Sequence, residues 1–60
     1  MHMIKVTRNE SFPEYYEIFD DGSPVDEVQG RNKAKREAKK LAKRNGEKSI
    51  IFLGELIDVD

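Results

Sequence analysis

The sequence contains no cysteine and no tryptophan, and its longest apolar run covers only residues 50–53. Without cysteine, the chain can form neither a disulfide nor a thiolate metal site. A run this short is far below the roughly 18–20 apolar residues that a membrane-spanning helix needs. The N-terminus also lacks the basic and then apolar stretches of a signal peptide. These absences lead us to expect a cytoplasmic protein.

Groups that carry catalysis are equally scarce. The single histidine, His2, stands before Met3 in what resembles a cloning remnant, so we expect the domain to span residues 3–60. No glycine-rich phosphate loop and no carboxylate pair beside a base is present. Asp20 and Asp21 are acidic neighbours, but a turn explains both. We therefore expect no enzymatic activity, no cofactor and no bound metal.

Sixty residues form one domain near the lower size limit for a chain that folds around its own core. Because disulfide and thiolate–metal staples are excluded, stability must come from tight packing of a helix on a sheet, or from self-association.

The first half of the chain has the alternation of strands. Residues 3–8 alternate apolar and polar side chains, and residues 14–19 are rich in aromatic and β-branched ones. Asp20–Ser23 contains Asp-Gly, which favours a tight hairpin turn. Residues 24–28 can then return as a third strand, with Pro24 at its tolerated first position.

Residues 31–44 have helical periodicity. Gly30 precedes them, Asn32 or the preceding Arg31 is the expected N-terminal cap, and Asn45-Gly46 ends the helix. The expected buried stripe recurs at the i, i+4, i+7 and i+8 positions and consists of Ala34, Ala38, Leu41 and Ala42. Such small residues let a helix lie close to a sheet that carries larger side chains.

Residues 49–53 are a fourth strand, Gly54 interrupts it, and residues 56–59 are either an edge extension or a loose tail. The sequence thus predicts an α+β domain in the order β-β-β-α-β. It consists of a small antiparallel sheet of three or four strands packed on one helix. The expected sheet core is Ile4, Val6, Tyr16 and Ile18, with either Ile50 and Phe52 or Ile51 and Leu53.

One helix can cover only one face of this sheet. The fourth strand is apolar on both faces, so the second face keeps apolar side chains without cover. We expect that face to be an interface with a protein partner or with a second copy of the chain. The predicted interface residues are Tyr15, Phe19, Ile51 and Leu53.

The net charge of −1 conceals a strong asymmetry. Residues 31–44 carry eight Lys or Arg against Glu37 alone, a net charge of +7, and the rest of the chain carries −8. Charge placed in this way concerns partners and association and not the fold.

At about 100° per residue, the centre of the outward helical face consists of Arg36, Lys39, Lys40 and Lys43. The residues that flank it are Lys33, Lys35 and Arg44. Four like-charged i, i+4 pairs result, which together cost about 1–2 kcal/mol at low salt. Only Glu37 relieves this repulsion, by pairing with Lys33 or Lys40.

Such a face suits nucleic-acid phosphates, which basic side chains contact with displacement of counterions. Binding would be largely blind to sequence, because Asn32 is the only amide side chain nearby. The alternatives are a merely solvated helix, or docking on the acidic surface of another copy of the chain or of another protein.

Two resemblances accompany these patterns. The segments 15–19, 21–22, 32–38, 41–43, 46 and 50–52 resemble a small uncharacterised family of short bacterial and phage-borne proteins. That family has strands, one alanine-patterned helix and a closing strand, and it implies no activity. Residues 15–46 are also similar in element order to the arm-type DNA-binding domain of phage tyrosine integrases. That domain reads DNA with its sheet, whereas the sheet region is acidic here, so the likeness concerns architecture.

The sequence therefore predicts a non-enzymatic accessory protein, of phage or mobile-element origin, that contacts nucleic-acid backbone through the basic helix. The alternative is a protein-interaction module, such as an inhibitor of a host protein, that uses the uncovered sheet face and the acidic surface.

Overall fold

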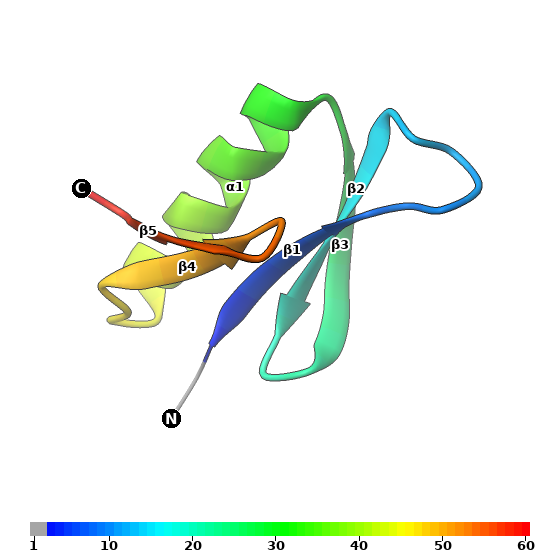
Figure 1. Cartoon of the computed structure of the whole chain (residues 1–60). Helices are drawn as coiled ribbons and strands as arrows, with labels where there is room; N and C mark the ends of the chain where they lie inside the picture. The colour runs from blue at the N-terminus through cyan, green and yellow to red at the C-terminus, as the bar shows by residue number, and fades with distance from the viewer. Residues whose placement is uncertain (1–2) are drawn as a thin grey trace.

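The computed structural model describes residues 3–60, so the expectation that Met1 and His2 are a cloning remnant concerns residues outside the described ones. Five strands and one helix make up the described chain (Figure 1). Their bounds are β1 Ile4–Arg8, β2 Tyr15–Asp20, β3 Ser23–Gln29, α1 Arg31–Arg44, β4 Ser49–Phe52 and β5 Glu55–Asp58. The prediction of an α+β domain with one helix is confirmed.

The sheet has the strand order β3-β2-β1-β4-β5, which corrects two expectations. It contains five strands and not three or four, because residues 55–58 pair with β4. It is also mixed and not purely antiparallel. The helix carries the chain from β3 at one edge across to β4, which therefore lies parallel to β1.

Two tight hairpin turns of the same kind join antiparallel strands. Asp21 and Gly22 connect β2 to β3 with φ of 53° and 88°. Leu53 and Gly54 connect β4 to β5 with φ of 51° and 82°. Positive φ at both central residues is the pattern of a type I′ turn, which matches the twist of the strands. Gly54 thus closes a hairpin, where the sequence had indicated an interruption followed by an extension or tail.

Helix α1 ends as expected but begins differently. The Gly46 N–H donates to the Lys43 carbonyl at 3.1 Å and the Glu47 N–H to the Ala42 carbonyl at 2.8 Å. These are the paired bonds with which a helix ends on a left-handed glycine. At the other end Gly30 holds the cap position, and no side chain caps the helix. The expectation that Asn32 or Arg31 is the cap is wrong, because Arg31 is already the first residue of the helix and Asn32 lies in its first turn.

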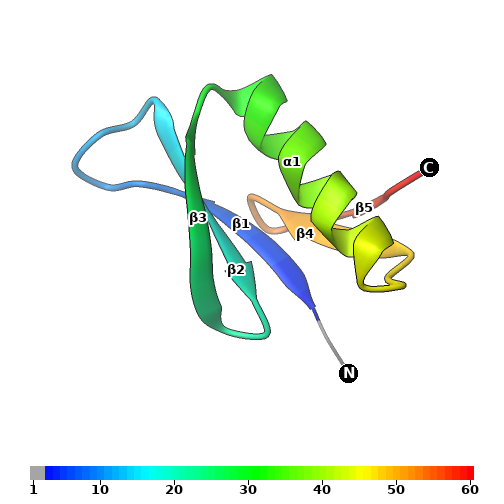
Figure 2. The ribbon, with the colours of Figure 1, turned by 180° about the vertical axis from the view of Figure 1, so that it is seen from behind.

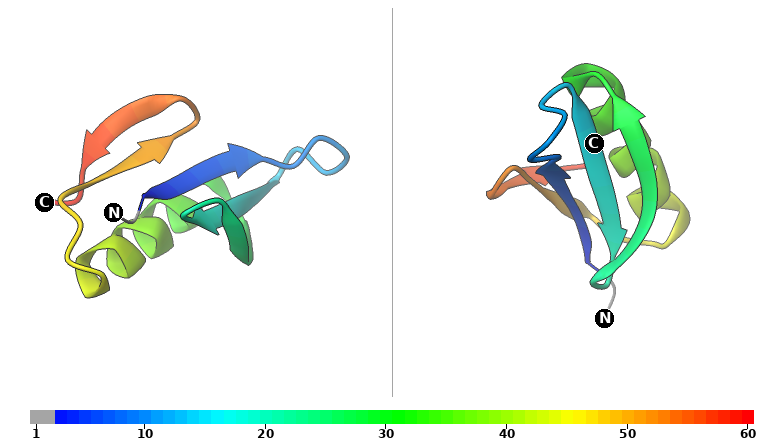
Figure 3. Two further views of the ribbon diagram at one scale, coloured as in Figure 1. Left: turned by 90° about the horizontal axis from the view of Figure 1, so that it is seen from below. Right: turned by 90° about the vertical axis from the view of Figure 1, so that its right-hand side faces the viewer.

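The helix lies on one face of the sheet (Figures 2 and 3). Ala34, Ala38 and Ala42 are fully buried beneath it, with Leu41 partly buried beside them. The buried side chains that the sheet and the C-terminal segment supply are Ile4, Val6, Tyr16, Ile18, Val28, Ile50, Phe52 and Val59. Of the two alternatives for β4, the pair facing the helix is therefore Ile50 with Phe52. Val59 packs into this core, so the C-terminal segment is not a loose tail.

Candidate nucleic-acid interface

The predicted phosphate-binding side chains all lie on α1, outside the alanine stripe that packs on the sheet. Arg36, Lys40 and Lys43 are exposed, and Lys39 is half-buried. Of the flanking cations, Lys33 and Arg44 are exposed and Lys35 is half-buried. The helix is a layer of its own above the sheet, so nothing else in residues 3–60 covers its outward face (Figure 3).

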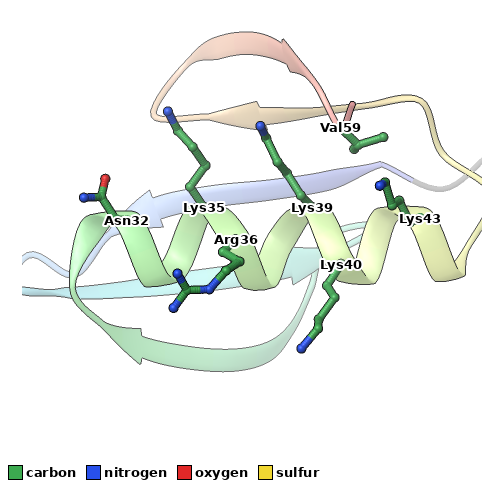
Figure 4. Close-up of a pocket in the computed structure, with 7 residues that line it drawn as sticks. All are labelled: Asn32, Lys35, Arg36, Lys39, Lys40, Lys43 and Val59. Carbon is green, nitrogen blue, oxygen red and sulfur yellow. The ribbon is translucent and has the colours of Figure 1, made fainter.

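The cations form two ridges along this face. Lys35, Lys39 and Lys43 extend toward β4 and β5, whereas Arg36 and Lys40 point to the other side of the helix (Figure 4). Successive members of a ridge are four residues apart, which is a rise of about 6 Å along the axis. Together with Asn32 and Val59, these five cations line an open depression of about 440 Å³.

Close ion pairs are few along the ridges, although Asp26 and Glu37 line a depression together with Lys40 and Arg44. Among the described residues, the one carboxylate within 4 Å of a helix cation is that of Asp60, whose Oδ1 lies 3.2 Å from Lys43 Nζ. Both partners of this pair are largely exposed, so it contributes little to stability. The expected pairing of Glu37 with Lys33 or Lys40 is not found among these contacts. The remaining cations are available to an external anion.

Two cations near the start of the helix have a structural contact as well. The Arg31 guanidinium carbon lies 5.5 Å and Lys35 Nζ 5.4 Å from the centroid of the Phe52 ring. The ring itself stacks on Tyr16, with centroids 6.2 Å apart. Attraction between a cation and an aromatic face helps to hold these side chains over the sheet. Lys35 is therefore a weaker candidate for phosphate contact than the four central cations.

The face of the sheet opposite the helix carries the predicted interface residues. Strand register aligns Phe19 of β2, Lys5 of β1, Ile51 of β4 and Leu56 of β5 in one row across four strands. Leu56 is 65% exposed, and Phe19 and Ile51 are half-buried. The sequence alone missed Leu56, because its place in the row depends on the hairpin between β4 and β5.

The other two predicted interface residues lie outside this row. Leu53 is at the tip of the hairpin turn and is 38% exposed. Tyr15 lies at the far end of β2, where its ring meets the edge of the Phe12 ring at a centroid distance of 6.3 Å. The structure thus brings Phe19 and Ile51 into one row and separates Tyr15 and Leu53 from it.

Two carboxylates lie directly opposite each other beside the row. Register pairs Glu17 with Glu27, and the Asn9 Nδ2 donates to Glu17 Oε1 at 3.3 Å and to Glu27 Oε2 at 2.9 Å. Like charges facing each other across two strands are destabilising. A neutral amide bridges them, and within residues 3–60 no Lys or Arg nitrogen lies within 4 Å of either carboxylate.

In the part of the chain that the structure describes, no three His, Asp or Glu side chains are grouped so that they could hold a metal ion. The helix found in this part is too short and too polar to cross a bilayer.

A scan against protein-family models, a search of curated proteins and a search of solved structures each gave no significant match. The suggestion of function therefore comes from the chain's own charge and geometry.

Proposed function

We propose that the protein is a non-enzymatic binding protein that contacts the phosphate backbone of nucleic acid through the outward face of α1. The observation that carries this proposal is the pair of cationic ridges on α1, which have few close ion pairs. Repulsion between like charges four residues apart lowers the stability of such a helix. Arg36, Lys39, Lys40 and Lys43 make the contacts, and Lys33 and Arg44 extend the surface at its margin.

Contacts of this kind position a protein without reading sequence. Long basic side chains dominate the face, and Asn32 alone could pair with a base edge at its margin. We expect duplexes of different sequence to bind with dissociation constants within about threefold of one another, a spread small beside the cost of one mismatch in a specific site.

Salt dependence of affinity is the decisive measurement. Fluorescence anisotropy with labelled duplex DNA, single-stranded DNA and duplex RNA gives dissociation constants at two salt concentrations. Four neutralised phosphates on duplex DNA imply that affinity falls about a hundredfold between 50 and 200 mM salt. Absence of binding at the lower salt concentration, or an affinity that salt does not change, contradicts the proposal.

A matched pair of variants separates the helix from net charge. Lys39→Glu with Lys43→Glu should abolish binding, whereas Lys5→Glu with Lys48→Glu changes the net charge equally at exposed sites outside the helix. We expect the second variant to retain binding within about tenfold, because screening limits the reach of a surface charge to about 10 Å. Equal loss in both variants would contradict a site on α1. Circular dichroism checks that each variant is folded.

A further inference from the structure

The sheet face opposite α1 combines an apolar row with acidic margins. The row of Phe19, Ile51 and Leu56 crosses three strand spacings, about 14 Å at the usual separation of strands. Lys5 lies within the row, between Phe19 and Ile51. A length of about 14 Å equals the rise of about nine residues of α-helix. The apolar side of a helix of about three turns, lying across the strands, could therefore cover the whole row.

A depression lies near each end of β2, and the two depressions are on different sides of the row. On one side Phe12, Tyr15 and Glu27 line a depression of about 280 Å³, with Glu17 opposite Glu27. On the other side Asp21 shares a depression of about 400 Å³ with Met3, Phe19 and Lys5. Aromatic faces beside a carboxylate suit a guanidinium or ammonium group. Each margin thus offers a place for a basic side chain next to the apolar row.

The carboxylates of the first margin are held in an unfavourable arrangement. Glu17 and Glu27 repel each other across the strands, and only the Asn9 amide lies between them. A cation brought by a partner would relieve this repulsion. The acidic pair and the cations of α1 are thus both groups of like charges, and they lie on opposite faces of the sheet.

From this geometry we propose that the open sheet face binds a basic amphipathic helix of another protein. The apolar side of that helix covers Phe19, Ile51 and Leu56, and its Lys or Arg side chains reach the acidic margins. This inference does not depend on nucleic-acid binding, because it concerns a different surface.

A second copy of the chain fits this face poorly. Two such faces laid together would oppose acidic margins, with Lys5 as the one cation in the row of each copy. The helix α1 of another copy offers cations, but its apolar stripe of Ala34, Ala38 and Ala42 is already buried against its own sheet. A partner helix that has Lys or Arg side chains and a free apolar side complements both the acidic margins and the apolar row.

A synthetic helical peptide of about 15 residues serves as the probe. It carries leucine at i, i+3, i+4 and i+7 and Lys or Arg elsewhere. One control peptide has the same composition with its leucines spread around the helix, and another has Glu in place of every Lys and Arg. Titration into ¹⁵N-labelled protein locates binding from the amide shifts.

We expect the amphipathic basic peptide to shift the amides of Phe19, Ile51 and Leu56 and to leave those of α1 in place. The same-composition control should bind at least about tenfold more weakly, because it cannot cover the apolar row. The acidic control should leave the sheet face unshifted. Equal binding of the basic peptide and its same-composition control would overturn the proposal, as would an unshifted sheet face.

Three variants test the two halves of the surface separately. Leu56→Ser should weaken peptide binding about fivefold, because it removes an exposed part of the row. Glu17→Gln with Glu27→Gln keeps an oxygen acceptor for Asn9 and should weaken binding about threefold. Lys5→Ala removes the cation from the row and should tighten binding by a similar factor.

Variants with affinities unchanged from the parent would overturn the proposal. Light scattering on the free protein provides the remaining check. A dimer that dissociates when Leu56→Asp is introduced would assign this face to self-association and would overturn the proposal as well.

Discussion

At the scale of single residues, Leu53 and Asp21 hold equivalent places in two turns of the same kind. Their φ angles are 51° and 53°, and each is followed by a glycine at positive φ. Asp tolerates this left-handed conformation, whereas for a leucine it costs roughly 1–2 kcal/mol. Leu53 is 38% exposed, so its burial offsets only part of that cost. The turn between β4 and β5 is therefore strained at one residue.

Replacing this leucine should stabilise the protein. We expect Leu53→Asn to raise the free energy of unfolding by about 1 kcal/mol, since asparagine favours this turn position. For a domain of this size, that is a rise in Tm of about 4–8 °C in a thermal melt. Asp21→Leu is the matched control and should lower Tm by a similar amount. A neutral or destabilising Leu53→Asn would show that the leucine packs more than its exposure indicates.

At the scale of elements, we expect the cations on the outward face of α1 to lower the stability of the fold. Lys39 repels both Lys35 and Lys43, its neighbours four residues away on the same ridge. We expect Lys39→Glu to replace two repulsions by two attractions and to stabilise the fold by about 1 kcal/mol in urea unfolding. Lys39→Gln should give about half that gain. Both variants should weaken nucleic-acid binding, so stability and affinity change in opposite directions. Destabilisation by both would mean that the Lys39 side chain is held for packing.

Turn chemistry and periodicity made most of the elements visible in the sequence. Asp21-Gly22 marks the first hairpin and Asn45-Gly46 the end of α1, because both pairs favour conformations that few other residues adopt. The alanine stripe predicted the buried side of the helix, and Ala34, Ala38 and Ala42 are indeed fully buried. The outward cations followed from the same periodicity. Local signals of this kind involve only a few neighbouring residues.

Features that depend on distant pairing were not visible. Leu53-Gly54 is an unusual turn pair, so it indicated an interruption, and the following residues were expected to be either an edge extension or a loose tail. Both alternating sets of residues in β4 are apolar, which left the choice between Ile50 with Phe52 and Ile51 with Leu53 open. Packing under α1 decides that choice. The row that ends at Leu56 requires the full strand register, which no local pattern contains.

At the scale of the whole molecule, the two proposed surfaces lie on opposite sides. The predicted phosphate-binding cations lie on α1, and α1 covers one face of the sheet (Figure 3). The apolar row, with its acidic margins, lies on the sheet face that α1 does not cover. Occupation of one surface therefore leaves the other accessible. A protein built in this way could hold a nucleic acid and a basic protein segment at the same time, with the sheet between them separating the opposite charges.

The C-terminal segment with β4 and β5 should be required for folding. Ile50, Phe52 and Val59 all belong to the buried core, and β4 lies beside the central strand β1 under the helix. A fragment of residues 3–46 retains three strands and α1, but it would leave the alanine stripe partly uncovered and make β1 an edge. For a domain that buries so little surface, we expect this fragment to be unfolded by circular dichroism and by amide shift dispersion. Adding a peptide of residues 47–60 should restore the dispersed spectrum. A folded fragment would instead mean that three strands and a helix suffice.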